Sequence, residues 1–193
     1  MNAMPMPEKS KINAKKYAAK EFSEFAKTKE ERFELIDGRI IMMASPKRIH
    51  QKIVGFIYRK LGDYLDQKPC EPFISPFDVV LSEKNEIWDK SKNVFQPDVF
   101  VVCDPKKISE ERITGAPDFV VEVTSPSNSE RDYYYKCNAY MKYGVKEYWI
   151  INPETKNILV YINGEEIKTY SFTFDDKIKA SIFENFEIDF KEI

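Results

Sequence analysis

The stretch that decides the fold is QPDVFVVCDPKKISEERITGAPDFVVEVTSP, residues 96–126. It contains two short runs rich in β-branched and aromatic residues, which are typical of interior strands. Each run carries one carboxylate where burial alone would favour a hydrocarbon, Asp98 in the first and Glu122 in the second. A buried carboxylate is costly unless a cation or several hydrogen bonds accompany it. Neighbouring strands would place the two acids roughly 5 Å apart, so the sequence predicts a shared site for a hard divalent cation.

A second Pro-Asp pair in this stretch is excluded from that site by distance. Asp118 shares a strand face with Glu122, because side chains alternate along a strand with a period of two. Four residues at about 3.3 Å each nevertheless separate them by roughly 13 Å, which one small ion cannot bridge. We therefore pair Asp98 with Glu122 and expect Asp118 to form hydrogen bonds at the strand end.

A wider set of motifs resembles the Uma2 family of restriction-endonuclease-like proteins. In chain order the matching residues are Phe33–Gly38, Ser45-Pro46, His50-Gln51, Pro97-Asp98, Glu122–Ser127, Arg131-Asp132, Lys136, Tyr140, Gly144–Ile150 and Asn152-Pro153. The resemblance runs from about Phe33 to Tyr161 and implies a PD-(D/E)XK nuclease. The implied fold class is α/β (α+β), a restriction-endonuclease-like mixed β-sheet flanked by helices, with β-hairpins near both ends of the chain. It also implies Mg²⁺, with Mn²⁺ as a substitute, held by Asp98 and Glu122.

One departure from the wider nuclease superfamily concerns the catalytic lysine. Many of those enzymes carry a lysine two residues after the glutamate, where this chain has Thr124. A threonine cannot supply the positive charge that stabilises a developing anion. Lys136 is the candidate replacement, because similar proteins of the Uma2 family carry a lysine at this place.

The surroundings of Lys136 leave two interpretations open. The sequence 127–130 is typical of a capping box and predicts a helix that ends near Gly144. If this helix folds back along the preceding strand, Lys136 approaches Glu122, and Lys136→Met should lower turnover with little effect on folding. Alternatively, Lys136 forms a surface pair with Asp132 and extends to solvent.

Other polar residues are weaker candidates for the same site. Three of them could approach a metal or a phosphate from the first hairpin, the long helix and an extended segment: Glu34, His50 and Asp78. Each also has a structural interpretation as a surface or packing residue. A basic helical face could follow a nucleic-acid backbone, or be a solvated face, and includes Lys47, Arg48 and Lys52. The Val123 carbonyl is a candidate third metal ligand.

Local patterns predict the remaining organisation. Residues 1–13 are expected to form a flexible arm and 14–193 a single domain. Asp37-Gly38 predicts a two-residue hairpin turn, and Asn163-Gly164 predicts a second one between strands within 158–170. Ser45 as N-cap and Pro46 at the first helical position predict a long helix that ends at about Gln67.

Composition limits the function classes. A net charge of −2 is not that of a general polyanion binder, so affinity for nucleic acid would depend on local patches and bound metal. Three cysteines without a CxxC spacing, Cys70, Cys103 and Cys137, predict neither a disulfide framework nor a zinc site, and we expect reduced packing residues. No membrane-spanning run or signal peptide is seen, which predicts a cytoplasmic protein.

The leading functional hypothesis is a Mg²⁺-dependent endonuclease that hydrolyses phosphodiester bonds of nucleic acid, with DNA as the expected substrate. A homodimer is left open. The first alternative is a catalytically inactive nuclease-fold binding or regulatory module, which Thr124 favours. The second is a hydrolase of small phosphoesters, which predicts a closed pocket in place of an open groove.

Overall fold

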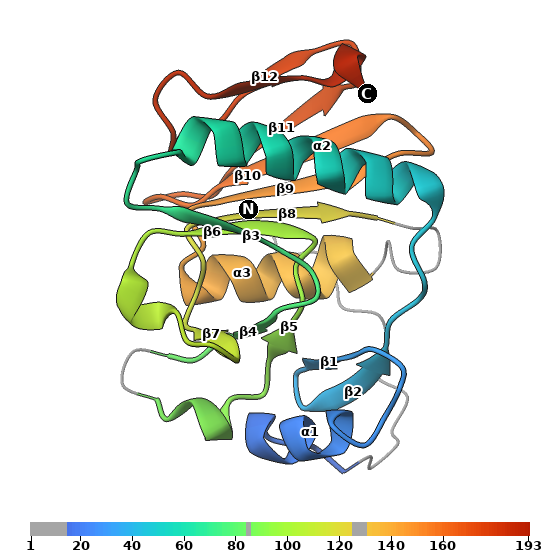
Figure 1. The fold of residues 1–193 in the computed structure, drawn as a ribbon, viewed down its shortest axis with the longest axis vertical. Helices are drawn as coiled ribbons and strands as arrows, with labels where there is room; N and C mark the ends of the chain where they lie inside the picture. The colour runs from blue at the N-terminus through green and yellow to red at the C-terminus, as the bar shows by residue number, and fades with distance from the viewer. Residues whose placement is uncertain (1–14, 84–85, 125–130) are drawn as a thin grey trace.

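The computed structural model describes residues 15–83, 86–124 and 131–193, with the backbone alone for 131–133. The expected arm at 1–13 and the expected capping box at 127–130 lie outside the described residues. Two mixed sheets form the body of the protein, and a small two-stranded sheet lies at one end (Figure 1).

The larger sheet has six strands in the order β11-β10-β9-β8-β6-β3. β8 and β9 are parallel and the other neighbours are antiparallel. The bounds are β3 (Glu71–Ile74), β6 (Val99–Val102), β8 (Phe119–Val123), β9 (Glu147–Asn152), β10 (Asn157–Ile162) and β11 (Lys168–Thr173). The strands β6 and β8 read as nearly continuous apolar runs because both faces of this sheet are covered.

Alternate residues of these strands pack against different helices. Val99 and Val121 belong to the cluster that includes the buried side of α2 (Arg48–Leu65). Phe100 and Val120 belong to the cluster that includes α3 (Cys137–Tyr143). Figure 1 shows α2 over one face of the sheet and α3 between its other face and the smaller sheet. By this alternation, Asp98 lies on the same sheet face as Phe100, and Glu122 lies on the same face as Val120.

The smaller sheet has the order β2-β1-β5-β4-β7. Its bounds are β1 (Phe33–Ile36), β2 (Arg39–Met42), β4 (Asp78–Val80), β5 (Val94–Phe95) and β7 (Arg112–Thr114). The predicted turn at Asp37-Gly38 is confirmed, since both residues have positive φ, 48° and 76°. The short helix α1 (Ala19–Ala26) packs on this sheet through Ala19 and Phe22.

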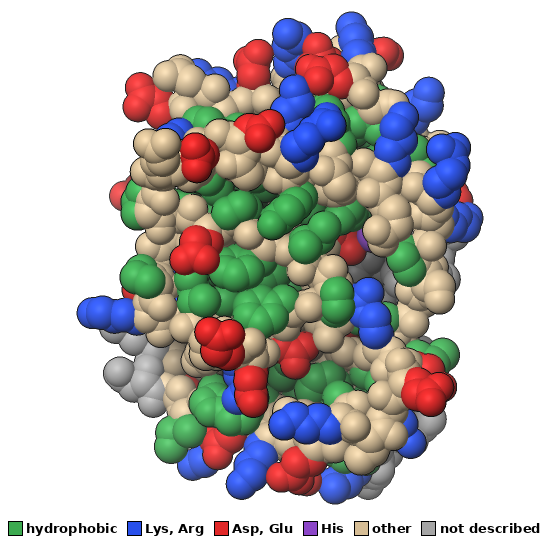
Figure 2. Space-filling view, in the orientation of Figure 1, with side chains coloured by type: hydrophobic (Ala, Val, Ile, Leu, Met, Phe, Trp, Pro, Cys, Tyr) green, Lys and Arg blue, Asp and Glu red, His purple; other side chains and the backbone are tan. Residues whose placement is uncertain are grey.

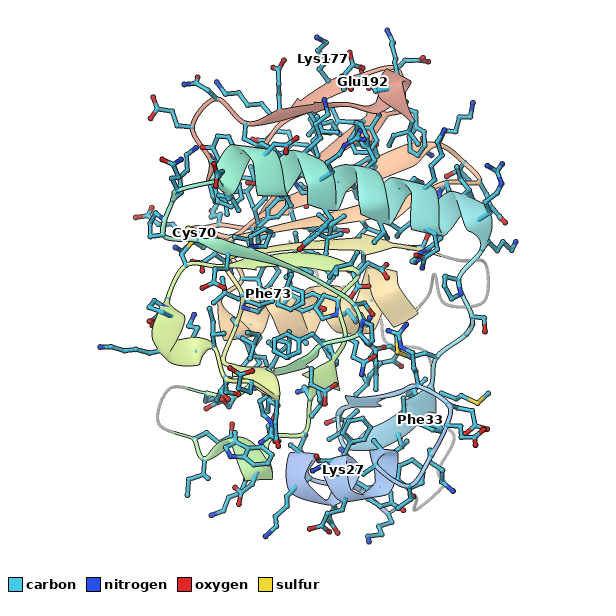
Figure 3. All side chains as sticks on the ribbon, viewed as in Figure 1. Lys27, Phe33, Cys70, Phe73, Lys177 and Glu192 are labelled. Atoms are coloured by element: carbon cyan, nitrogen blue, oxygen red, sulfur yellow. A yellow bond between two sulfur atoms is a disulfide. The ribbon has the colours of Figure 1, made fainter. Side chains whose placement is uncertain are left out.

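An aromatic stack lies in the layer between the two sheets. Phe73 of β3 stacks on Phe77 and Phe100, with ring centroids 5.5 and 5.3 Å apart respectively (Figure 3). This stack joins β3 and β6 to the segment that leads into β4.

The helix that follows the first hairpin begins later than the sequence predicts. α2 starts at Arg48 with Lys47 as N-cap, so the predicted start at Ser45 and Pro46 is wrong. Residues 43–46 form the connection between β2 and α2 and line a cleft. The buried side of the helix consists of apolar residues between Ile53 and Leu65.

The crossover from β8 to β9 contains two helical segments. A π-helical segment, η3 (Arg131–Lys136), leads directly into α3, which ends at Gly144 with φ 94°. Gly144 is therefore the left-handed terminal residue that its position in the sequence predicts. Lys136 is the last residue of the π-helical segment.

The C-terminal part differs from its prediction in two ways. The hairpin of β10 and β11 is present, but five residues, 163–167, connect the strands in place of a two-residue turn. Asn163 instead donates hydrogen bonds to the carbonyls of Met141 and Val145, at 2.9 and 3.0 Å, and so stabilises the end of α3. Beyond it, β12 (Lys177–Lys179) pairs with β13 (Glu187–Asp189) before the 3-10 segment η4 (Phe190–Glu192), and these segments cover α2.

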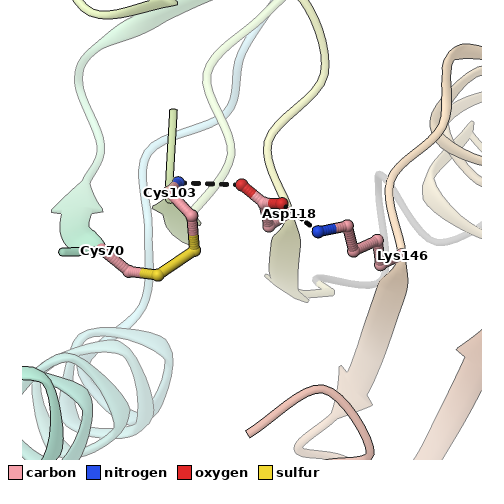
Figure 4. The surroundings of a disulfide bond; sticks show 4 residues. All are labelled: Cys70, Cys103, Asp118 and Lys146. Carbon is pink, nitrogen blue, oxygen red and sulfur yellow. Dashed lines mark hydrogen bonds and ion pairs between the residues drawn. A yellow bond between two sulfur atoms is a disulfide. The ribbon is translucent and has the colours of Figure 1, made fainter. Parts of the chain in front are cut away.

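A disulfide joins Cys70 and Cys103, so the expectation of three reduced cysteines is wrong (Figure 4). The register of β3 and β6 pairs Glu71 with Val102, and its continuation by one residue places the two cysteines opposite each other. The two cysteines are adjacent only because β3 pairs with β6, so the spacing of cysteines in the sequence does not predict the disulfide. Cys137 is free and buried, as predicted, and burial raises the pKa of its thiol to about 12.

The other helical segments are short. They are the 3-10 turns η1 (Trp88–Lys90) and η2 (Pro105–Lys107). Among the described residues, no helix has the length and apolar character needed to cross a membrane.

Candidate active site

Asp98 and Glu122 come from adjacent antiparallel strands. The register pairs Val99 of β6 with Val121 of β8, and its continuation places Asp98 opposite Glu122. Directly opposed residues share a sheet face, with Cβ atoms about 5 Å apart. Both acids line one cleft with a volume of about 70 Å³. Its other walls come from Arg32, the connection between β2 and α2, the first half of α2, the end of β3 and Lys136.

Asp118 occupies the other end of β8, as expected. One oxygen accepts a hydrogen bond from the backbone N–H of Cys103 at 2.8 Å, and the other lies 2.7 Å from the Lys146 ammonium (Figure 4). Asp118 does not line the cleft. Its role is therefore to join the ends of β6 and β9.

The Asp98 carboxylate is held through a single oxygen. Oδ2 accepts a hydrogen bond from the backbone N–H of Val123 at 2.8 Å and lies 3.1 Å from His50 Nε2. Among the described residues, none donates a hydrogen bond to Oδ1. One oxygen is thus fixed by the protein while the other can bind a ligand.

Lys136 lies between two buried carboxylates. Its ammonium is 2.8 Å from Glu122 Oε1 and 2.9 Å from Glu34 Oε1. The Lys136 side chain is only 2% exposed, so the alternative in which it extends to solvent is wrong. The positive charge beside Glu122 therefore comes from the crossover between β8 and β9. Thr124, two residues after Glu122, is buried, and its backbone N–H donates a hydrogen bond to the Ile151 carbonyl at 2.8 Å.

Tyr140 also contacts Glu122 and was not predicted as a site residue. Its hydroxyl donates to Glu122 Oε1 at 2.9 Å. Burial, followed by the nearby Glu122 charge, raises the pKa of Tyr140 well above its usual value, so it remains a neutral donor. The i, i+4 spacing of Lys136 and Tyr140 on a helix is the sequence signal that could have identified it.

Of the weaker candidates, Glu34 and His50 lie at the site and Asp78 lies beside it. Glu34 is fully buried, contacts Lys136 and also accepts a hydrogen bond from the Gln96 backbone at 2.9 Å. His50 lines the cleft, and its Nδ1 has no hydrogen bond to the described residues. Asp78 does not line the cleft and instead accepts a hydrogen bond from Gln96 Nε2 at 2.9 Å. Burial raises the pKa of Asp78.

The three basic candidates lie at or near the N-terminal end of α2, and none of them lines the cleft. Lys47 lies 3.3 Å from Glu154, and Lys52 donates to the Ile193 carbonyl at 2.8 Å. Arg48 is exposed and forms no ion pair with the described residues. Figure 2 shows Lys and Arg side chains over the N-terminal end of α2 and over the end of the molecule that carries β12 and β13, with acidic side chains among them. Sequence reasoning also missed Arg32, a cleft residue on the same strand face as Glu34.

The donor set at the cleft fits a magnesium ion. Asp98, Glu122 and the Val123 carbonyl offer oxygen atoms, the donor type that Mg²⁺ prefers, and all three residues line the cleft. Mg²⁺ is commonly bound by one or two carboxylates and keeps several waters, each of which needs roughly 10–15 Å³. No group of three His, Cys, Asp or Glu side chains in the described part of the chain is arranged as a metal cage. The residues therefore suit a partly hydrated ion.

The comparisons with known proteins agree with the fold. The family model Uma2, described as "Putative restriction endonuclease", matches residues 19–191, most of the chain. The chain belongs to the Uma2 family. This Uma2 protein is 26% identical over 152 residues to "Uncharacterized protein slr1290" from Synechocystis sp., a match that covers 78% of this chain and 76% of the relative.

A solved structure shows the fold of this Uma2 protein. It is the crystal structure of "a putative nuclease belonging to DUF820" from Anabaena variabilis, with a TM-score of 0.68 and 19% identity. The match covers 85% of this chain and 90% of that one. The resemblance and the fold class predicted from the sequence are thus confirmed.

Proposed function

We propose that this Uma2 protein is a Mg²⁺-dependent endonuclease that hydrolyses phosphodiester bonds of DNA. The observation that carries the proposal is the convergence of Asp98, Glu122 and Lys136 on one cleft, from two strands and the crossover that follows them. Membership of a family described as "Putative restriction endonuclease" supports the same reaction class.

The residues have separable roles in this proposal. Asp98, Glu122 and the Val123 carbonyl would hold the ion, which when bound supplies a more acidic water and stabilises charge on the phosphate. The backbone N–H of Val123 orients Asp98 at 2.8 Å. Lys136 and Tyr140 both contact Glu122 Oε1, which fixes the orientation of that carboxylate at the cleft.

Lys136 would also provide the positive charge that Thr124 cannot provide. Its ammonium is buried, where the low dielectric strengthens its field at the reacting phosphate. Removing one preorganised charged contact to a transition state costs on the order of 3 kcal/mol, a hundredfold or more in rate.

A cleavage assay tests the proposal. Supercoiled plasmid, single-stranded DNA and RNA are incubated with the protein in Mg²⁺, Mn²⁺ or EDTA. We expect metal-dependent cleavage of DNA, which Asp98→Asn and Glu122→Gln should abolish. The matched control is Asp118→Asn, since Asp118 also follows a proline but lies outside the cleft.

Two outcomes would overturn parts of the proposal. Metal-dependent cleavage of RNA alone would refute the DNA substrate. No cleavage of any nucleic acid would favour a nuclease-fold binding module. One observation supports that alternative: Lys136 forms ion pairs with two buried carboxylates and so has a structural role without any turnover.

A further inference from the structure

Arg32 brings a positive charge to the cleft that no carboxylate neutralises directly. It precedes β1, is half-buried and lines the cleft together with Asp98. Its guanidinium contacts neutral groups: Nε and Nη2 donate to Gln96 Oε1 at 3.0 and 2.9 Å, and Nη2 also donates to Ser75 Oγ. Among the described residues, no carboxylate forms an ion pair with it.

The groups that hold Arg32 are themselves fixed next to the acid pair. Gln96 lies two residues before Asp98, and its side-chain amide donates to Asp78 at 2.9 Å. The backbone N–H of Ser75 donates to the Asp98 carbonyl at 3.2 Å. Arg32 therefore has an orientation that is set by the same backbone that positions Asp98.

The unused donors of Arg32 indicate the kind of ligand. A guanidinium has five N–H donors in a plane, and the Nε and Nη2 groups account for the bonds to the protein. The two donors of Nη1 form no hydrogen bond with the described residues. A charged, planar donor pair on a cleft wall suits a phosphate oxygen, because Arg–phosphate bonds are charge-assisted and depend on this geometry.

We propose that Arg32 binds a non-bridging oxygen of the nucleic-acid phosphate that enters the cleft. The inference rests on the proposed function, because it takes nucleic acid as the ligand. It goes beyond that function because it assigns a phosphate contact to Arg32 inside the cleft, at a place separate from the basic face of α2. The competing interpretation is that Arg32 only balances the charge of nearby buried acids, Glu34 and Asp78.

Binding without turnover separates these two roles. The affinity for a short fluorescein-labelled DNA duplex is measured in EDTA over a series of KCl concentrations. Arg32→Gln should weaken binding about tenfold at low salt and should reduce the slope of log K against log [salt] by about one phosphate contact. The matched control is Arg39→Gln, because Arg39 is exposed on β2 and does not line the cleft.

Arg32→Lys provides a second variant in case Arg32→Gln does not fold. It keeps the charge and loses the planar fork, so it should bind more weakly than the wild type with an unchanged salt slope. Circular dichroism and the melting temperature report folding for each variant.

Three results would overturn the assignment of Arg32. They are an Arg32→Gln variant that binds like Arg39→Gln, an Arg32→Lys variant that binds like the wild type, and a wild type that binds no DNA. A wild type whose binding depends on Arg32 but that cleaves nothing in Mg²⁺ or Mn²⁺ would support the phosphate contact and refute the nuclease. Failure of one proposal is thus distinguishable from failure of the other.

Discussion

Replacement of Lys136 by methionine removes a charge from an enclosed polar cluster. Methionine is a flexible apolar side chain that can fill much of the same space. The ammonium lies 2.8 Å from Glu122 and 2.9 Å from Glu34, and these two residues are 4% and 0% exposed. Lys136→Met therefore leaves two buried carboxylates without their shared cation.

The expected cost follows from this burial. Removing one partner of a buried ion pair costs about 3–5 kcal/mol, whereas a surface pair is worth less than about 1 kcal/mol. For a protein of this size each kcal/mol shifts the melting temperature by roughly 2–4 °C, so we expect a decrease of about 6–20 °C. This value replaces the sequence-based expectation that Lys136→Met leaves folding nearly intact.

A double mutant checks the reasoning behind that value. Urea unfolding gives the free energy of unfolding for the wild type, Lys136→Met, Glu34→Gln and the double mutant. Glu34→Gln should recover part of the stability in the Lys136→Met background, because it removes one of the two repelling charges. A loss below about 1 kcal/mol in Lys136→Met, or additive losses in the double mutant, would refute the buried triad.

Three further predictions concern metal, pH and the disulfide. Mg²⁺ or Mn²⁺ should raise the melting temperature of the wild type and have little effect on Glu122→Gln, and equal responses would exclude a metal site at Glu122. Burial raises the pKa of Asp78, so the folded protein disfavours the charged form of this side chain. Asp78→Asn should therefore be more stable than the wild type at pH 7. Urea titrations should show that this gain in stability disappears as the pH falls toward 3.8, the ordinary pKa of the group. The Cys70–Cys103 bond spans a sequence separation of 33, so its reduction should lower the free energy of unfolding by about 4 kcal/mol on the chain-entropy model. The Cys70→Ser, Cys103→Ser double variant is the control. An unchanged unfolding midpoint after reduction would contradict that value.

The acid pair could be predicted from the sequence because its geometry is local to two strands. Both β6 and β8 are apolar runs, and an antiparallel connection between them brings Asp98 opposite Glu122. The first hairpin was predictable for a similar reason, since its turn needs residues that tolerate positive φ.

Contacts between the two sheets had no such signal. The contact of Glu34 with Lys136 depends on how β1 packs against the crossover, and the position of Arg32 depends on the same packing. The pairing of Cys70 with Cys103 depends on β3 lying beside β6. Each of these results from tertiary arrangement, which periodicity does not encode.

Two local signals also did not give the structure that they predict. Ser45 has the character of an N-cap, yet it lies in the connection that lines the cleft. Asn163 has the character of a turn residue, yet its amide is used to bond the end of α3. Local propensity is a weak guide where a side chain has a stronger distant partner.

The π-helical segment makes the position of Lys136 depend on residue number as well as residue type. In η3 the backbone bonds span five residues, whereas α3, which follows directly, has the usual spacing of four. Insertion or deletion of one residue in an α-helix rotates all later side chains by about 100°. A single-codon deletion within residues 131–135 could therefore turn the ammonium away from both glutamates with every site residue still encoded.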